Sequence, residues 1–424
     1  MKSKMMKKLF TAAMVAVMVV GSFAGCNKTT EEADPVADEN AVTQAASATD
    51  APAATEAVPQ VKGGTIMWLS NLSSGSAYDG AVNYATMICS ELGYDFQVVY
   101  GDMYNDPAAN LTAVKNGMTK DVVAIIMSQD GGVKDIMAEY PEIYVAGYNT
   151  DMASVYGEGG ASAEVVTNAK FLGTICDGYF DGTLTGQAYA QRVIDKGYKK
   201  VATMIFPVYA YPQNTVADLA FRAEIAKYNE SAAADQQIVI VGDAKVLEFA
   251  PLDESYFLEE GNSDLDAIVG MLAGTDFIYP AMKSAMSNGS CSKDMKLITG
   301  GFNTDESIIA DIGGEGVIQS LSFSPTEDIA WSIIMLDNAL SGTMYSDYSA
   351  SERVSSLPYV ISSKEDIDNV MSKSMTGTTD ITLTQLTIDD IKSVLVRYTA
   401  TATYADLKAL FQNEKLSVAS LATK

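Results

Sequence analysis

The sequence contains no histidine in its 424 residues. A Ser-His-Asp or Cys-His nucleophile pair, a histidine general base and any metal site that needs imidazole are therefore excluded. Basic residues are scarce as well, because 28 Lys and Arg stand against 54 Asp and Glu and give a formal net charge of −26. Such a charge repels a phosphate backbone, which proteins bind through lysine and arginine, so no nucleic-acid partner is expected.

Cysteines are few and widely spaced, at positions 26, 89, 176 and 291, and no two of them form a CxxC motif. Cys89, Cys176 and Cys291 each lie in or beside an apolar stretch, where a thiol usually behaves as a small buried hydrophobe. Three cysteines cannot all pair within one chain, so buried free thiols are favoured over a disulfide.

Catalytic and cofactor motifs are also missing. No GxxxxGK[ST] phosphate loop occurs, and the glycine-rich stretch 311–316 is better interpreted as a loop. A glycosidase stays open as an alternative, because two carboxylates suffice for that chemistry, but 54 acids do not single out a pair. The sequence therefore predicts a protein that is not an enzyme and holds no metal or cofactor.

The first 25 residues have the pattern of a secretion signal. Four lysines between positions 2 and 8 precede an apolar run over 9–24, which is too short for a comfortable membrane-spanning helix. The run ends in Phe23-Ala24-Gly25-Cys26, which resembles the bacterial lipobox. This resemblance implies that residues 1–25 are removed, that Cys26 is lipidated and that the protein is anchored on the extracytoplasmic face of the cell membrane. The alternative is an ordinary cleaved signal with a chance cysteine.

Residues 26–62 have the composition of a flexible linker. Between positions 27 and 60 there are seven acids and a single lysine, and Pro35, Pro52 and Pro59 interrupt any helix. We expect this acidic segment to hold a folded head away from the lipid surface.

From residue 63 the chain alternates short apolar runs with helical periods. Strands are expected over 64–69, 96–100, 122–127 and 143–148, then over 171–175, 201–206, 238–241, 267–272, 297–300 and 317–321. Helices are expected from 77 to 92, where Gly93 stops the helix, and over 111–118, 183–196, 216–228 and 327–340. Strands that are apolar throughout, with helices between them, predict two doubly wound α/β domains with parallel sheets. A weaker strand over 389–396 and a helix over 404–411 are expected in the tail.

Several stretches, in their order, carry a family resemblance: 121–127, 143–149, 177–197, 300–303 and 316–325. Together they resemble the substrate-binding proteins of ABC importers that have the type 1 periplasmic-binding fold, over roughly residues 63–361. The resemblance implies a cleft between two lobes that closes on a small ligand, and an ABC permease as the membrane partner.

The resemblance also implies the lobe boundaries. The N-terminal lobe is expected over 63–171 and 302–325, and the C-terminal lobe over 172–301 and 326–361. Hinge strands are expected near 170–174, 300–303 and 321–325. Residues 362–424 form a C-terminal extension whose placement is left open.

Candidate ligand-binding residues follow the ends of the expected strands, because open parallel sheets bind ligands beyond the carboxyl ends of their strands. The candidates are Asn71, Ser73, Tyr78, Asp130, Asn149 and Asp151 in the N-terminal lobe. Phe206 and Tyr209 supply aromatic faces in the second lobe, and the resemblance adds Arg222, Asn303 and Phe323. For each of them the alternative is a cap, a turn or core packing.

Carboxamides and carboxylates suit vicinal hydroxyls, so the expected ligand is a sugar. Ala273-Gly274-Thr275 and the stretch 138–141 instead resemble the basic-membrane-protein, nucleoside-binding branch, and a nucleoside stays open. A ligand sensor for a membrane signalling partner is the second alternative to transport.

Overall fold

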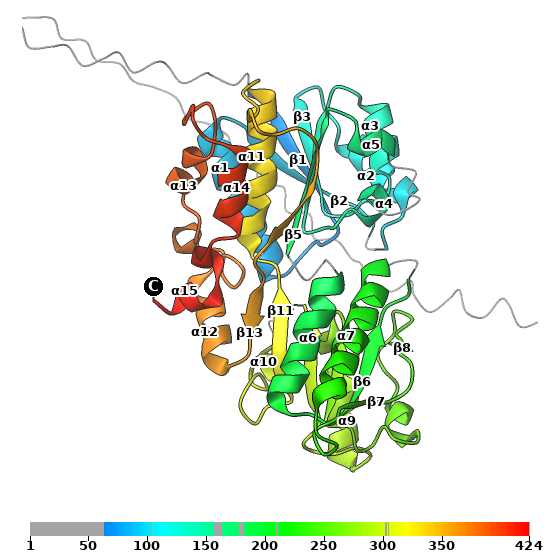
Figure 1. Cartoon of the computed structure of the whole chain (residues 1–424). Coiled ribbons are helices and arrows are strands. Elements are labelled where there is room, and N and C mark those ends of the chain that lie inside the picture. Colours follow the sequence, from blue (N-terminus) through cyan, green and yellow to red (C-terminus); the bar gives the residue numbers. More distant parts are fainter. Residues whose placement is uncertain are drawn as a thin grey trace, which may run out of the picture. The chain divides into compact units, whose positions relative to one another are not determined.

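The computed structural model describes residues 63–102, 104–156, 163–177, 182–208, 211–301, 303 and 305–423. Its strands form two sheets, and we call the parts built on them the first and second lobes (Figure 1). The expected signal peptide, the lipidation site at Cys26 and the acidic linker lie outside the described residues.

The first sheet is parallel throughout. Its order is β12 (Arg353–Ser356), β5 (Phe171–Asp177), β4 (Tyr144–Tyr148), β3 (Val122–Met127), β1 (Thr65–Ser70) and β2 (Asp95–Tyr100).

Both faces of this sheet are covered by helices. Ile66 and Trp68 of β1 pack in one core with α1 (Ser76–Leu92) and α11 (Ile329–Leu340). Met67 and Leu69 pack on the opposite face with the remaining helices, α2 (Pro107–Gly117), α3 (Val133–Glu139), α4 (Ala153–Tyr156) and α5 (Ala163–Val166). This alternation along β1 confirms the prediction of a strand buried on both faces.

The second sheet has seven strands. Its order is β13 (Tyr359–Ile361), β11 (Ile318–Phe323), β10 (Lys296–Gly300), β9 (Ala267–Gly270), β6 (Lys200–Ile205) and β7 (Val239–Ile240), with β8 (Lys245–Val246) also paired to β6. Only β13 runs antiparallel to its neighbour among these described strands.

Helices cover this sheet on both faces too. One face packs against α6 (Gly182–Lys196) and α7 (Pro212–Ser231). The other carries η1 (Glu254–Leu258), α8 (Gly274–Phe277), α9 (Tyr279–Asn288) and α10 (Glu306–Ile309). The fold class expected from the sequence, two doubly wound α/β lobes, is therefore correct.

The expected division into lobes needs correction. Residues 302–325 were assigned to the first lobe, but β11 pairs with β10 and β13 in the second sheet. Residues 326–361 are expected in the second lobe, but α11 packs on β4 and β5 and β12 pairs with β5, so of the strands in this range β13 alone joins the second sheet. The stretch 171–175 belongs to β5 of the first sheet. Hydrophobic periodicity identifies a strand but does not say which sheet it joins.

The hinge therefore lies elsewhere than expected. The chain passes between the lobes after β5, between β11 and α11, and between β12 and β13. The first passage includes residues 178–181, which lie outside the described residues. Residues 300–303 do not cross, since β10 and α10 both belong to the second lobe.

The C-terminal extension packs on both lobes. It contains α12 (Lys364–Lys373), η3 (Ile381–Leu383), α13 (Ile388–Ser393), α14 (Tyr404–Phe411), η4 (Glu414–Leu416) and α15 (Val418–Ala422). The expected strand over 389–396 is wrong, because Thr387 and Asp390 form a capping box that starts α13. The expected helix over 404–411 is correct.

The three cysteines of the described chain, Cys89, Cys176 and Cys291, are buried, which confirms the interpretation as core thiols. Within the described ranges, no helix is both long and apolar enough to cross a membrane.

A buried ion pair ties the C-terminal extension to the first lobe. The Arg397 guanidinium donates to both carboxylate oxygens of Asp337 on α11, at 2.9 and 2.7 Å, and to the Leu92 carbonyl at the end of α1. The two side chains are 3% and 0% exposed. Removing one partner leaves an uncompensated buried charge, which costs far more than losing a surface ion pair.

We expect Arg397→Met to lower the free energy of unfolding in urea by about 3–5 kcal/mol. The matched control is Lys408→Met, which removes a half-exposed ion pair with Glu352 at 2.9 Å. That change should cost about 0–1 kcal/mol. Equal losses in the two variants would contradict the structural role of the Arg397–Asp337 pair.

Candidate ligand-binding site

A cavity of about 450 Å³ lies between the two lobes. The described residues that line it from the first lobe are Asn71, Tyr104, Asn105, Ser128, Gln129, Asp130, Asn149, Thr150, Asp151, Ala153 and Ser154. Those from the second lobe are Tyr211, Pro212, Gln213, Phe249 and Leu272.

The first-lobe residues reach the cavity because parallel strands end at a common edge. Asn71 directly follows β1, residues 128–130 follow β3, and residues 149–151 follow β4. Ser128 is held from below, since its Oγ accepts a hydrogen bond from Trp68 Nε1 at 2.8 Å. The core of the lobe therefore fixes the floor of the cavity.

Asn149 is oriented by an unusual backbone. Its φ of 55° lies in the left-handed region, which asparagine tolerates better than most residues. Its amide donates to the Ile175 carbonyl at 2.9 Å, and its Oδ1 accepts from Ser324 Oγ at 2.8 Å. Ser324 uses one lone pair of Oδ1, so Asn149 can offer a ligand its Nδ2 hydrogens and the second lone pair of Oδ1.

Asp130 and Asp151 place two carboxylates at the same lip of the cavity. Asp130 accepts from Asn105 Nδ2 and from the Ser154 amide, both at 2.7 Å. Asp151 accepts from the Ala153 amide at 3.0 Å, and Arg353 approaches its Oδ2 at 4.0 Å. These bonds fix both side chains before any ligand arrives.

Burial of Asp151 destabilises its charged form. Burial, and next the charge of Asp130, raise the pKa of Asp151 from 3.8 to about 6, although the Ala153 N–H and Arg353 partly offset them. The carboxylate is therefore held in a poor environment that hydrogen-bond donors of a ligand can improve.

Aromatic rings form the opposite wall. Phe249 of the second lobe lies 6.1 Å from Tyr211 and 5.4 Å from Phe206, measured between ring centroids. Tyr104 of the first lobe meets Phe249 edge to face at 5.8 Å, so these two rings join the lobes at the cavity.

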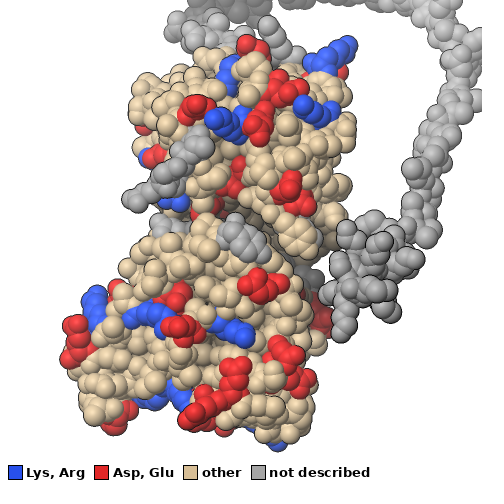
Figure 2. Space-filling model, turned by 90° about the vertical axis from the view of Figure 1, so that its right-hand side faces the viewer, with Lys and Arg blue, Asp and Glu red and all other residues tan. Residues whose placement is uncertain are grey.

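Two carboxylates, but no lysine or arginine, occur among the described residues that line the cavity. On the molecular face in Figure 2, acidic and basic side chains of the described residues are intermingled rather than gathered into one basic patch. In the described part of the chain, no group of three or more Cys, Asp or Glu side chains has the arrangement of a metal site.

Four of the residues expected from the sequence line the cavity: Asn71, Asp130, Asn149 and Asp151. Ser73 is exposed in the loop after β1 and does not line it. Tyr78 is buried, stacks on Trp68 and shares a hydrogen bond with Tyr100. These two expectations need correction, because the chain turns away after Asn71 and the Tyr78 ring packs into the core.

The expected second-lobe residues also lie outside the lining. Phe206 is buried beneath Phe249 and Phe277. Arg222 pairs with Asp218 at 2.8 Å and donates to Thr203, which ties α7 to β6. Tyr209 lies outside the described residues.

Asn303 and Phe323, which were also expected to bind the ligand, do not line the cavity either. Asn303 donates to Asp276 at 2.6 Å and accepts from the Asp305 amide, so its polar atoms serve the loop before α10. Phe323 ends β11 and packs edge to face on Tyr359.

The sequence reasoning missed several lining residues. Tyr104 and Asn105 follow β2, and the rule that identified Asn71 applied equally to that strand. Phe249 follows β8, a strand of two residues that leaves no periodic signal in the sequence.

Comparison with known proteins rests on structure alone, because neither a family model nor a curated protein matches the sequence. An ABC-transporter solute-binding protein from Burkholderia graminis, in complex with D-arabinose, is 14% identical with a TM-score of 0.52, over 76% of this chain and 100% of that one. The arabinose-transporter binding protein of Shewanella sp. ANA-3, bound to α- and β-L-arabinofuranose, is 15% identical with a TM-score of 0.54, over 72% and 93%.

A glucose-galactose binding protein from Geobacillus stearothermophilus is 16% identical with a TM-score of 0.52, over 72% of this chain and 99% of that one. The chain has the type 1 periplasmic-binding-protein fold. At these identities the likeness establishes the fold, and a ligand has to be argued from the cavity.

The raised pKa of Asp151 predicts a pH-dependent stability. Below about pH 4 the carboxyl is protonated in both the folded and unfolded states, and its contribution to stability is fully present. As the pH rises to about 6, the unfolded state loses the proton first, so this contribution is lost.

Asp151→Asn cannot ionise and keeps an oxygen for the Ala153 amide. We expect it to raise the free energy of unfolding of the ligand-free protein by about 1–3 kcal/mol near pH 7, with a difference that shrinks towards about pH 4. The control is Asp294→Asn, an exposed acid away from the cavity, which should change little at either pH. Urea unfolding at several pH values measures both, and a variant that is less stable near neutrality would contradict the argument.

Proposed function

We propose that this protein is an extracytoplasmic solute-binding protein that captures a neutral sugar between its lobes and delivers it to an ABC importer. The observation that carries the proposal is the cavity, where amide and carboxylate groups at strand ends face an aromatic wall. On this proposal the protein binds its ligand without chemical change and is not an enzyme.

Sugar chemistry suits both walls. A carboxylate accepts two hydrogen bonds, and an amide donates and accepts, so Asp130, Asp151, Asn71 and Asn149 can match a row of hydroxyls. Aromatic rings such as Tyr211 and Phe249 can cover the apolar C–H face of a pyranose or furanose. Of the three similar structures described above, two contain bound arabinose and the third is named a glucose-galactose binding protein, which supports the same ligand class.

The charges of the lining favour a neutral ligand. Two carboxylates without a lining cation repel a sugar phosphate or a uronic acid, and a buried anion without a partner costs several kcal/mol. Neutral hydroxyls instead donate to the carboxylates and relieve their poor solvation.

The fold offers a mechanism for delivery. A ligand that contacts both lobes binds the closed arrangement more tightly, and this difference in affinity shifts the population towards closure. The importer can then distinguish loaded from empty protein by the angle between the lobes.

The turn that suggested a nucleoside gives that alternative no support. Thr275 is buried, and the Gly274 amide donates to Thr299 Oγ1 at 2.9 Å, so this turn packs on β10. Of its immediate neighbourhood, only Leu272 lines the cavity.

A thermal-shift panel tests the ligand class. We expect D-arabinose, L-arabinose, D-galactose or D-glucose to raise the melting temperature, by the equivalent of about 2.7 kcal/mol at a hundred times the dissociation constant. D-galacturonate and galactose 1-phosphate should have no effect at the same concentrations. Stabilisation by the anionic sugars alone, or by uridine alone, would contradict the proposal.

Asn71 provides the matched binding test. Its side chain makes no hydrogen bond to another described residue, so Asn71→Ala should leave the ligand-free melting temperature unchanged. An unpaired hydroxyl in the closed cavity costs about 1–3 kcal/mol, so affinity for the stabilising sugar should fall roughly five- to a hundredfold in calorimetry. Asn168→Ala, an exposed change away from the cavity, should keep wild-type affinity, and the same result for Asn71→Ala would remove it from the site.

We also propose that Cys26 carries the lipid anchor, on the basis of the Phe23–Cys26 motif and the preceding apolar run. Two acyl chains hold a protein stably at a membrane, whereas a single chain binds reversibly. The acidic linker then spaces the binding lobes from the surface.

Cys26→Ala should release the protein into the soluble fraction of a bacterial host, because no diacylglyceryl group can be attached. The control is Cys291→Ala, a buried thiol that should leave the protein in the membrane pellet. Fractionation in high salt followed by immunoblotting measures both. A Cys26→Ala protein that still pellets would mean that another segment anchors the chain.

A further inference from the structure

Residues 362–423, which we call the C-terminal strap, contact both lobes. Its two ends pack on the second lobe, where Ile367 and Val370 of α12 lie beside Val418 and Leu421 of α15 in one core. Lys373 Nζ donates to the Leu421 carbonyl at 3.2 Å and joins the two ends. The strap therefore begins and finishes on the same lobe.

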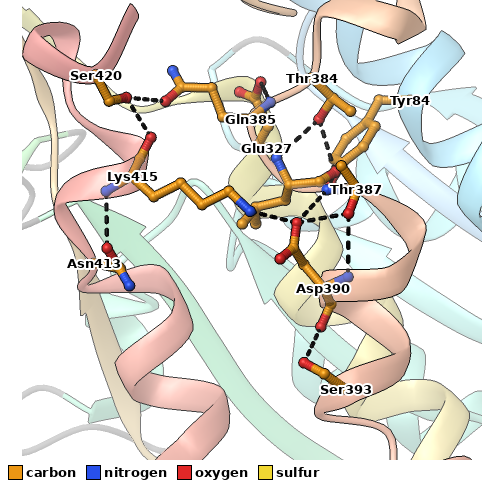
Figure 3. A network of polar contacts seen from close by, with 11 residues as sticks. Tyr84, Glu327, Thr384, Gln385, Thr387, Asp390, Ser393, Asn413, Lys415 and Ser420 are labelled. Carbon is orange, nitrogen blue, oxygen red and sulfur yellow. Dashed lines mark hydrogen bonds and ion pairs between the residues drawn. The ribbon is translucent and has the colours of Figure 1, made fainter. Parts of the chain in front are cut away.

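The middle of the strap packs on the first lobe. Leu395, Leu407 and Phe411 are fully buried in the core that also contains α1 and α11. The Arg397–Asp337 pair described above lies in this part. Tyr84 of α1 donates to the Leu386 carbonyl at 2.8 Å (Figure 3).

The strap consequently passes between the lobes twice. Val370 lies in the second-lobe core and Met375 in the first-lobe core, and Leu416 and Val418 make the reverse change. These passages add to the three made by the rest of the chain. Any rotation of one lobe against the other must deform the strap at both places.

The strap also contacts the passage between β11 and α11. The Thr326 amide donates to Thr376 Oγ1 at 3.0 Å, and the Gln385 amide donates to Glu327 Oε1 at 3.3 Å. The cavity contacts the same passage, because Ser324 Oγ donates to Asn149 Oδ1. One short segment therefore contacts the strap and the ligand site together.

The Gln385 side chain connects the first-lobe part of the strap to two elements that pack on the second lobe (Figure 3). It is 1% exposed, and it follows η3 on the side of the first lobe. Its Nε2 donates to the Tyr359 hydroxyl of β13, and its Oε1 accepts from Ser420 Oγ of α15 at 2.8 Å. Both partners belong to elements packed on the second lobe.

We propose that the C-terminal strap is a restraint on the hinge, which limits how far the two lobes separate from the arrangement where Tyr104 meets Phe249 and so sets ligand affinity without touching the ligand. The contacts of Gln385 with Tyr359 and Ser420 exist only while the lobes keep this relation, and the Thr376–Thr326 bond ties the first passage of the strap to the passage between β11 and α11. Their loss frees the lobes to separate, which reduces the fraction of protein in the binding-competent state.

The test measures the distance between the lobes without any ligand. Spin labels are attached to Asp135→Cys on the first lobe and Lys227→Cys on the second, both exposed, in the full chain carrying Cys26→Ser. The native cysteines Cys89, Cys176 and Cys291 are buried and stay unlabelled. Pulsed dipolar spectroscopy then reports the distribution of distances.

Two bridging variants are compared with one matched control. Gln385→Ala removes the bonds to Tyr359 and Ser420, and Thr376→Val removes the acceptor for the Thr326 amide at nearly constant volume. Thr403→Ala removes the capping box of α14, which lies in the strap but joins no lobes. All three destabilise the strap locally, but only the first two loosen a passage between lobes.

We expect the same distribution in the parent protein and in Thr403→Ala, and a broader one that extends to longer distances in Gln385→Ala and Thr376→Val. Affinity for the sugar found by screening should fall about 5- to 100-fold in the bridging variants. Identical distributions in all folded variants, or an equal broadening in Thr403→Ala, would overturn the restraint. Because the distances are recorded without ligand, this result is independent of whether the ligand is a sugar.

Discussion

Parallel pairing of strands is the constraint on which the rest of this molecule depends. It brings the carboxyl ends of β1, β3 and β4 to one edge of the first sheet, so residues far apart in sequence meet there. The polar side chains of the short loops after these strands are not used in strand pairing. They can therefore present amides and carboxylates to a space that the second lobe closes with aromatic rings.

The acidic cavity and the hinge are linked by the hydrogen bond between Asn149 and Ser324. Asp151 is buried near Asp130, and no lysine or arginine is among the described residues that line the cavity. This lowers the stability of the ligand-free protein and favours a ligand that donates hydrogen bonds. Asn149 Oδ1 accepts a hydrogen bond from Ser324, which lies in the passage that the strap contacts. A change of the angle between the lobes therefore moves the Asn149 carboxamide, which lines the ligand cavity.

Local signals in the sequence were reliable where one residue decides the outcome. Gly93 ends α1 in a left-handed conformation, and the strand-end rule placed Asn71, Asp130, Asn149 and Asp151 correctly at the cavity. Pairing between distant elements was not predictable, because a buried apolar strand such as β11 fits either sheet equally well. Aromatic faces were expected in the second lobe, but Phe249 was missed for the same reason, since it reaches the cavity only through the packing of the lobes. In the strap, the Thr387–Asp390 spacing indicates a capping box, but Ile391 and Val394–Val396 within 389–396 favoured a strand.

The most direct measurement of the central claim is a crystal structure of the protein with the sugar that stabilises it most. The account predicts one sugar between the lobes, with its hydroxyls on Asn71, Asn149 and the two aspartates, and its ring against Tyr211 or Phe249. A sugar bound to one lobe alone, or away from these residues, would contradict it.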